Sequence, residues 1–393
     1  MSLERKLIAL QQTEITAWEQ PKIFQLQNGK NDELEELLDQ DQISRVKNLS
    51  DSTIDELARM RFPVRMHSED VRAEYRKDLI EQGVDYGGYA AFDDRDGRKH
   101  LVHYPPEQDH TELLHWRHNG RLTPEHRQKI YKDVTGFLFG LSVGNSIAQG
   151  LVRAGAMDTA YIGDTDTISL SNLGRLAYHP EDVDRLKTVA TADSLTRINP
   201  YIKINILPNG YDVATDELLE QVRPSFIVEE VDSPTAKAGI ERAAIENKIP
   251  VFTVADIQNA VLEVRRHDKE VLQPFGGRLS LEQYNSLLSG TANQVEQLKA
   301  MVGIVGEENV LSDTELIEAL SDPASGGFPQ LFEIVSAGAA LSTSAIVAYL
   351  KGREVKTGTY TYDPGAILEI GHPYDPQYRQ LVADNFSKTI GIA

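Results

Sequence analysis

The sequence predicts an α/β protein built on a doubly wound, mostly parallel sheet, and three observations favour this class. Short apolar segments alternate with amphipathic helical segments between residues 134 and 255, which is the pattern of a parallel sheet covered by helices. A glycine-bearing turn follows the first apolar segment, and acidic residues directly follow two others. In such a sheet, ligands bind at the carboxyl ends of the strands.

The glycine-bearing turn joins a strand predicted over residues 134–139 to a helix predicted over 146–154. It contains Gly140, Ser142 and Gly144. A turn of small residues at a helix N-terminus presents free backbone N–H groups, which stabilise phosphate charge. We therefore expect these three residues to bind a nucleotide phosphate.

Two acids follow the second strand, which is predicted over residues 159–162. Asp164 and Asp166 stand about twenty residues after the turn, where a carboxylate accepts hydrogen bonds from ribose hydroxyls. Strand, glycine turn, helix, strand and acid together form a βαβ nucleotide-binding unit.

The rest of the sheet follows from the same alternation. Further strands are predicted near 202–207, 226–231 and 251–255, and further helices near 183–198, 216–222 and 234–247. Gly140, Asp164 and Asp232 then all lie at the carboxyl edge of the sheet.

More polar residues follow the acids in a fixed order. Ser171-Asn172-Leu173-Gly174-Arg175 comes first, then Lys187, then Ile198-Asn199-Pro200, and finally Asp232 at a strand end. With the Asp-x-Asp pair, this set resembles the ThiF/MoeB family of adenylating enzymes, which includes the activating enzymes of ubiquitin-like proteins. The resemblance covers roughly residues 117–352.

The resemblance implies a Rossmann-like fold, ATP and Mg²⁺ as cofactors, and a role for each matching residue. It places Asp164 on the ribose with Asp166 beside it, and Asn172 and Arg175 on the phosphates. Lys187 would contact the α- and β-phosphates, and Asp232 would hold magnesium.

Two arginines precede the first strand. In the resembled family, an arginine in this region reaches across a dimer to the phosphates of ATP, and Arg117 and Arg121 have a comparable spacing from Gly140. A guanidinium suits this role because it stays charged and binds phosphate oxygens in pairs. The alternative is that both arginines lie on the surface before a helix beginning at Pro124. The resemblance also implies a homodimer.

The sequence departs from the family in three places. Ser142 replaces a commoner glycine, and Glu229 stands where an earlier aspartate is usual. The chain contains no cysteine, which excludes a thiol nucleophile and a thiolate zinc site in this chain.

Composition limits the partners. The 60 acidic and 40 basic residues give a net charge of −20, which disfavours nucleic acid and anionic membranes as partners. The longest apolar stretch, 334–350, contains Ser, Gly and Thr and is interpreted as a core helix rather than a membrane span. The first ten residues do not resemble a signal peptide, so we expect a cytoplasmic protein.

The sequence divides into an N-terminal α+β extension (1–115), an adenylation domain (116–352) with a helical insertion near 279–320, and a C-terminal hairpin and tail (353–393). Within the extension, residues 32–57 suggest a pair of helices and 86–104 a β-hairpin. Five histidines between 103 and 126 have no spacing typical of zinc. Residues 264–273 are interpreted as a solvated connection or as a basic patch for a substrate carboxylate.

The predicted function is ATP-dependent activation of a carboxylate as an acyl-adenylate, with release of pyrophosphate and without a catalytic cysteine. The carboxylate could belong to a small molecule, a peptide or a ubiquitin-like tail. Two alternatives stay open at this stage. One is a non-catalytic nucleotide-binding scaffold or partner subunit of the same fold, and the other is an NAD(P)-dependent oxidoreductase.

Overall fold

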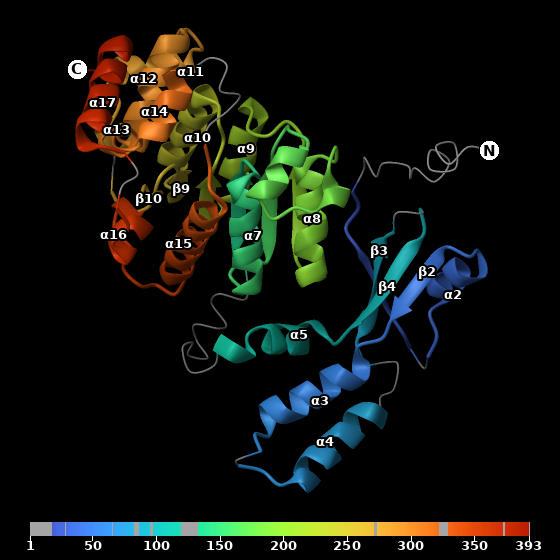
Figure 1. The fold of residues 1–393 in the computed structure, drawn as a ribbon. Coiled ribbons are helices and arrows are strands. Elements are labelled where there is room, and N and C mark those ends of the chain that lie inside the picture. The colour runs from blue at the N-terminus through green and yellow to red at the C-terminus, as the bar shows by residue number, and fades with distance from the viewer. Residues whose placement is uncertain are drawn as a thin grey trace, which may run out of the picture.

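The computed structural model describes residues 18–27, 29–64, 66–81, 86–94, 97–118, 133–270, 273–321, 329–371 and 374–392. Two sheets organise the molecule (Figure 1). The larger sheet and its helices form the main domain, and the smaller sheet belongs to an N-terminal unit.

The main sheet has seven strands in the order β11-β10-β9-β8-β5-β6-β7. Strands β5 to β9 are parallel to their neighbours, whereas β10 and β11 are antiparallel. The strands are β5 (Thr135–Phe139), β6 (Thr159–Gly163), β7 (Lys203–Leu207), β8 (Phe226–Glu229), β9 (Val251–Asp256), β10 (Ala260–Arg265) and β11 (Gly358–Tyr362). The chain order reverses between β5 and β8, so these two strands form the switch point at which ligands bind.

Helices cover both faces of this sheet. The core on one face joins β5 and β6 to α7, α8 and α15, and the core on the other face joins β5 and β8 to α9 and α10. The helices are α7 (Val143–Arg153), α8 (Lys187–Ile198), α9 (Val213–Val222), α10 (Pro234–Asn247) and α15 (Phe332–Leu350). The predicted doubly wound α/β class is confirmed.

The helix α15 is the one helix in the described ranges that is long and apolar enough to cross a membrane. It packs on the sheet instead, since Val335 and Ile346 are buried in the core with Phe252 of β9. Gly150 of α7 allows close packing there, because a Cβ at this position would lie 2.5 Å from Oγ1 of Thr343 in α15.

The N-terminal unit contains a four-stranded sheet in the order β1-β3-β4-β2. Its elements are β1 (Lys22–Gln25), α2 (Asp32–Asp39), β2 (Ile43–Lys47), α3 (Ser50–Arg61), α4 (Glu69–Glu81), β3 (Gly88–Asp93), β4 (Lys99–Tyr104), α5 (Glu107–Leu114) and the 3₁₀ helix η2 (Trp116–His118). The predicted hairpin is confirmed as β3 and β4, which pair antiparallel from Gly88–Tyr104 to Asp93–Lys99.

The prediction of two helices over 32–57 is wrong in its middle part. Residues 43–47 form β2, which pairs parallel with β4. The helix α2 stops because Asp41 adopts a left-handed conformation with φ of 54°, which ends a helix as glycine often does. Ile43 and Val46 therefore belong to an edge strand.

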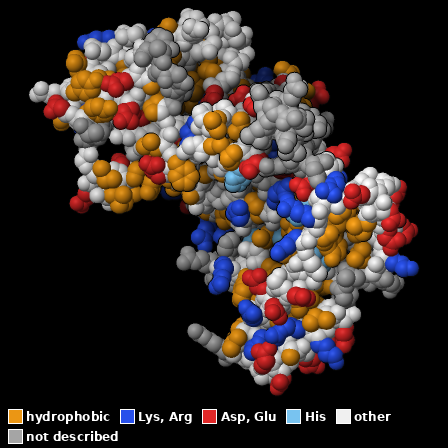
Figure 2. All heavy atoms as spheres, turned by 45° about the vertical axis from the view of Figure 1, so that its right-hand side comes forward, with side chains coloured by type: hydrophobic (Ala, Val, Ile, Leu, Met, Phe, Trp, Pro, Cys, Tyr) orange, Lys and Arg blue, Asp and Glu red, His pale blue; other side chains and the backbone are white. Residues whose placement is uncertain are grey.

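The N-terminal unit contacts the main domain at the end of α8 and along β7. The Tyr201 hydroxyl donates to the carbonyl of Pro105 at 2.6 Å. The Gln20 side chain binds the backbone of Ile202 and Ile204 at 3.0 and 3.2 Å. On the face that Figure 2 shows, Lys and Arg side chains lie among Asp, Glu and hydrophobic side chains.

The predicted helical insertion consists of α11 (Leu281–Leu288), α12 (Gln294–Val305), α13 (Glu307–Ser312) and α14 (Thr314–Ser321), preceded by the 3₁₀ helix η5 (Pro274–Gly277). The C-terminal segment adds β11, α16 (Pro364–Leu368) and α17 (Pro376–Ile390). The expected C-terminal hairpin does not form in the described residues, because β11 pairs with β10 of the main sheet. Phe386 and Ile390 of α17 pack against the insertion.

The interpretation of 264–273 as a solvated connection is wrong for residues 264–267, which are buried, whereas residues 268–270 are exposed. Arg265 ends β10 and is 1% exposed, and Arg266 and His267 are 3% and 5% exposed. These side chains are buried because acidic residues on neighbouring elements pair with them. Arg265 pairs with Glu241 of α10, and Arg266 pairs with Asp268.

Candidate active site

The glycine turn lies at the switch point between β5 and β8. Gly140 has φ of 83°, and a Cβ there would lie 2.3 Å from the carbonyl oxygen of Glu230. Its own N–H donates to the carbonyl of Gly163 at 2.8 Å. Glycine is therefore required to close the turn against the ends of β8 and β6.

The turn is held by Asp164. One carboxylate oxygen, Oδ2, accepts from the backbone N–H of Leu141 at 2.6 Å, and Oδ1 accepts from the N–H of Asp166 at 2.8 Å. Burial raises the pKa of Asp164, although Lys187 opposes this shift. Asp164 thus orients the glycine turn, and each oxygen keeps a lone pair for a further hydrogen bond.

Lys187 is the first residue of α8 and is 5% exposed. Its Nζ lies 3.1 Å from Ser142 Oγ, 2.8 Å from Asp166 Oδ2 and 3.8 Å from Asp164 Oδ2. The structure therefore brings together four of the predicted site residues around one buried ammonium group. Ser142 is the point of contact between this lysine and the glycine turn.

Asn172 and Arg175 lie on the 3₁₀ helix η3 (Leu170–Gly174) and directly after it. Asn172 is 9% exposed, and its Oδ1 accepts from the N–H of Ser169 at 3.0 Å, so it caps this turn. The Arg175 side chain donates from Nε to Gln330 Oε1 at 2.6 Å and from Nη1 to the Ser171 carbonyl at 3.3 Å. Gln330 thereby joins the candidate site.

Asp232 follows β8 and is exposed. Ser233 caps α10, since its Oγ accepts from the N–H of Ala236 at 3.3 Å. Among the described residues, no three His, Asp or Glu side chains converge in a way that could hold a metal ion. A magnesium ion at Asp232 would need oxygen ligands from ATP and water.

Three other predicted site residues, Gly144, Arg117 and Arg121, are not among the residues that contact Lys187 or Asp164 in the described part of the chain. At Gly144 in the first turn of α7, the nearest atoms to an added Cβ would be 3.8 Å away. Arg117 is exposed in η2, with its guanidinium 5.1 Å from the centre of the Trp116 ring. Arg121 and the helix expected from Pro124 lie outside the described residues.

A cavity of about 450 Å³ opens next to this edge of the sheet. Its polar side includes Ser142, Arg175 and Asp232, and its apolar side comes from the helical insertion. The apolar lining residues are Leu298, Met301, Val302, Ile304, Val305, Val310, Leu316 and Leu320. The insertion thus builds one wall of a chamber that the nucleotide edge completes, at a size typical of small-molecule sites.

Glu230 and Asp256 line the same cavity together with Glu263, and the sequence reasoning assigned none of these acids to the site. Burial raises the pKa of Asp256 to about 7. Burial and then the nearby Asp256 raise the pKa of Glu230 well above its usual range. A signal was present for both, because each is an acid at the end of an apolar strand.

A buried charge network lies behind the cavity. Glu229 accepts from Lys237 Nζ at 2.8 Å and from the N–H of Val231 at 3.1 Å. Arg265 Nε binds Glu241 at 2.8 Å, and its Nη1 lies 3.0 Å from Glu263. Burial would raise the pKa of Glu241, but Arg265 and His267 overcome this effect and lower the pKa to about 2.

The network fixes the role of Glu229. Its carboxylate is fully buried and already paired with Lys237. It therefore anchors α10 under the cavity rather than presenting a free ligand beside Asp232. Lys237 lines the cavity and was missed from sequence, because a lysine in a helix gives no sign of its buried partner.

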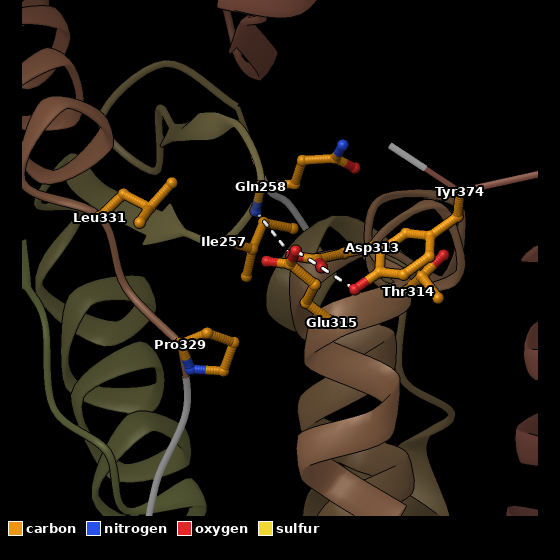
Figure 3. Close-up of a pocket in the computed structure, with 8 residues that line it drawn as sticks. All are labelled: Ile257, Gln258, Asp313, Thr314, Glu315, Pro329, Leu331 and Tyr374. Atoms are coloured by element: carbon orange, nitrogen blue, oxygen red, sulfur yellow. Dashed lines mark hydrogen bonds between the residues drawn. The ribbon is translucent and has the colours of Figure 1, made fainter. Parts of the chain in front are cut away.

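A smaller cavity of about 200 Å³ adjoins the first and shares Ile257 and Pro329 with it (Figure 3). Asp313 holds its shape by accepting from the backbone N–H groups of Gln258 at 2.7 Å and Leu316 at 2.9 Å. The lining residues are Ile257, Gln258, Asp313, Thr314, Glu315, Pro329, Leu331 and Tyr374. Figure 3 shows the ring of Tyr374 beside Thr314, with its hydroxyl directed toward Glu315 at 3.5 Å.

The strand order, with the glycine turn and the buried lysine at the switch point, is that of a doubly wound α/β domain, a fold that commonly binds nucleotides. Residues 118–268 match the model of the ThiF family. The match includes Gly140, Asp164, Arg175, Lys187 and Asp232.

Among curated relatives, an uncharacterized protein of Mycobacterium tuberculosis (strain CDC 1551 / Oshkosh) is 27% identical over 64% of this chain and 35% of its own length. The chain thus spans about a third of that relative. The molybdopterin-synthase adenylyltransferase of Escherichia coli (strain K12) is 26% identical over 51% of this chain and 79% of its own length.

Solved structures of similar fold include the E. coli tRNA N6-threonylcarbamoyladenosine dehydratase TcdA, with 16% identity and a TM-score of 0.43. The aligned region covers 62% of this chain and 95% of that one. Likeness of this degree carries no information on substrate.

Proposed function

We propose that this protein is an ATP-dependent adenylyltransferase that activates a substrate carboxylate as an acyl-adenylate and releases pyrophosphate. The observation that carries the proposal is the position of Lys187. Its buried ammonium group contacts Ser142 of the glycine turn and both acids after β6, at the switch point where this fold binds nucleotides. The ThiF-family match over the same residues supports it.

The residues fit ATP with magnesium. Gly140 and the N-terminus of α7 offer backbone N–H groups to phosphate, and Lys187 and Arg175 supply positive charge. Asp232 is exposed at the cavity and is suited to magnesium. Asp164 and the more accessible Asp166 are suited to the ribose. Magnesium would neutralise phosphate charge, and the protein's part is positioning and electrostatic stabilisation.

In the reaction, a substrate carboxylate oxygen attacks the α-phosphorus of ATP, and the bond to the bridging oxygen of pyrophosphate breaks. Negative charge grows on that oxygen, where Lys187 and Arg175 are positioned to stabilise it. Lys187 is held by Asp166 in the described structure, so a bound phosphate would compete with this exposed carboxylate for the ammonium group. The chain contains no cysteine, so the acyl group must pass to a nucleophile of the substrate or of another molecule.

We further propose a homodimer formed through α15 and α16. The helix α15 is uncharged over most of its length, with exposed Ala340 and Ser344 and with Phe332 62% exposed. A helix that is apolar all round usually packs on two sides. In α16 and just after it, Ile367 and Ile370 are each 62% exposed. A second copy would cover these residues.

The dimer is tested by sedimentation velocity of Ala340→Glu. A buried charge in the interface should convert dimers to monomers, whereas Val213→Glu, an 81% exposed position on α9, should leave the dimer intact. A monomeric wild type would contradict the interface.

For an ATP-using enzyme of this kind, we propose the cytoplasm as its location.

The adenylation proposal is tested by ATP–pyrophosphate exchange with magnesium and a pool of carboxylates. We expect Lys187→Ala and Asp232→Ala each to reduce exchange by about a hundredfold or more, since each removes charge stabilisation from the transition state. Lys203→Ala is the matched control, because Lys203 is exposed on β7. Wild-type ATP binding without exchange would favour the scaffold interpretation. Binding of NADH in place of ATP would contradict the proposal.

A further inference from the structure

Asp256 is a buried carboxylate without a partner. It ends β9 and is 5% exposed, and neither oxygen has a hydrogen bond within the described residues. Gly338 of α15 packs against it so closely that a Cβ there would lie 2.3 Å from Oδ1. Burying a carboxylate without donors is costly, so the fold holds this group in a position that its own contacts do not explain.

The carboxylate lines the 450 Å³ cavity together with Glu230. Glu230 has one hydrogen bond from the protein, which Oε1 accepts from the N–H of Val254 at 2.8 Å. The lining therefore carries two acids, of which Asp256 has no hydrogen-bond donor among the described residues.

The cations that line the cavity near these acids are already engaged. Lys237 is paired with Glu229 at 2.8 Å. Arg278 lies 3.6 Å from Glu263 and donates to the carbonyl of Ile304 at 2.6 Å. Arg175, the third cation in the lining, donates to Gln330 and to the Ser171 carbonyl. Each of the three cations thus has another partner, and a cation for Asp256 would come from a ligand.

The opposite wall is apolar. It is formed by α12 to α14, with Leu298, Met301, Val305, Val310 and Leu316 among its side chains. The polar edge with Arg175 and Asp232 lies at the same cavity. A ligand that matches all three regions has an apolar body, a protonated amine and a carboxylate.

We propose that the carboxylate activated here belongs to an apolar amino acid or short peptide, whose ammonium group binds Asp256 and Glu230. This inference rests on the proposed adenylation, because it directs the substrate carboxylate to the nucleotide edge. A diglycine tail of a folded protein ends in a carboxylate but offers neither an amine nor an apolar body, so the cavity disfavours it. The ammonium group would supply the hydrogen-bond donors that Asp256 lacks.

Binding is measured first without ATP, by calorimetry, with L-leucine, leucyl-leucine and 8-aminooctanoate, each beside its N-acetylated form. Acetylation removes the charge and leaves the apolar body and the carboxylate. We expect at least one free amine to bind about tenfold or more tightly than its acetylated form. Asp256→Asn and Glu230→Gln should each reduce this preference, and the control Glu220→Gln, at an exposed position on α9, should retain it.

Exchange of pyrophosphate with the same compounds separates this inference from the proposed function. Amine-dependent binding without exchange would contradict adenylation while keeping the amine site. Lys187-dependent exchange with the acetylated and free compounds alike would overturn the amine site while keeping adenylation. The amine site would also be overturned if each free amine bound as tightly as its acetylated form, or if none of these compounds bound. A preserved amine preference in Asp256→Asn, folded by circular dichroism, would exclude Asp256.

Discussion

The two halves of the candidate site are built on different physical principles. On the β5–β6 side, the site is a local structure: a turn, one carboxylate that holds it and one lysine, all within residues 140–187. On the β8–β10 side, the site rests on buried charges from three separate elements, β8, α10 and β10, with Arg265 at 1% exposure among Glu229, Glu241 and Glu263.

The two halves differ in how strongly a side-chain substitution should affect the stability of the fold. On the β5–β6 side, Asp164 relies on backbone N–H groups that persist whatever the neighbouring side chains are. On the other side, each charge depends on a partner side chain, and loss of one partner leaves another buried and unpaired. We therefore expect the β8–β10 side to dominate stability and the β5–β6 side to dominate turnover.

The largest effect on folding is expected from Arg265→Met. This change keeps an apolar stem of similar length and leaves Glu241 and Glu263 without their buried cation, which should cost about 3–5 kcal/mol in the free energy of unfolding. Urea denaturation at pH 7 measures it. Arg153→Met at the exposed end of α7 should cost under about 1 kcal/mol, and an equal cost for both variants would contradict the division between the two halves.

The same division explains how much could be predicted from sequence. The alternation of strands and helices around β5, the glycine turn and the group of Asp164, Asp166 and Lys187 follow from local spacing, since each depends on residues near in sequence to a strand end. No order of the strands in the sheet was predicted. The partners of Lys187 are confirmed as neighbours in space, whereas contact of these residues with ATP stays a prediction.

The rest could not be predicted because it depends on pairs far apart in the chain. Arg265 was assigned to a solvated connection, since neither its neighbours nor its spacing reveal Glu241 on another helix. Ile43 and Val46 continued the helical spacing of α2, but the left-handed Asp41 ends the helix without a glycine or proline to mark it. The cavity lining from α12 to α14 likewise appears only once the insertion folds over the sheet edge.

The next largest effect is expected from Gly140→Ala, where the two halves meet. The added Cβ would lie 2.3 Å from the Glu230 carbonyl oxygen, and Gly140 itself has φ of 83°. Steric overlap and backbone strain should therefore lower the free energy of unfolding by about 3 kcal/mol. Gly174→Ala is the matched control, because no atom lies within 4 Å of its Cβ position. Thermal unfolding of both variants measures the difference, and similar melting temperatures would show that the turn relaxes away from β8.

A smaller effect, with a distinct pH dependence, is expected from Asp256→Asn. The pKa of Asp256 is raised from 3.8 to about 7 in the folded protein, so the folded state binds its proton more tightly than the unfolded state. The stability that this proton binding contributes is fully present below the unfolded pKa of 3.8 and is lost as the pH rises toward 7. Between pH 5 and pH 8, the free energy of unfolding of the wild type should fall by about 2–3 kcal/mol more than that of the variant.

Urea denaturation of wild type and Asp256→Asn at both pH values, without ligand, gives this difference directly. Asp216→Asn is unsuitable as a control because Asp216 is paired with Arg242, whereas Glu220→Gln alters an exposed acid and should follow the wild-type pH dependence. Parallel curves for wild type and Asp256→Asn would mean that Asp256 is ionised and stabilised in the folded protein.

The smallest effect on stability is expected from Gly144→Ala, which separates folding from nucleotide binding within the β5–β6 half. In the first turn of α7 the nearest atoms to the new Cβ are 3.8 Å away, and alanine is the better helix former, so stability should rise by about 0.5–1 kcal/mol. If phosphate approaches the backbone of this turn, the same methyl group should weaken ATP binding about tenfold, as measured by calorimetry. A variant that is more stable and binds ATP as wild type does would show that Gly144 serves the helix alone. The phosphates would then have to be bound by side chains such as Lys187 and Arg175 rather than by the turn.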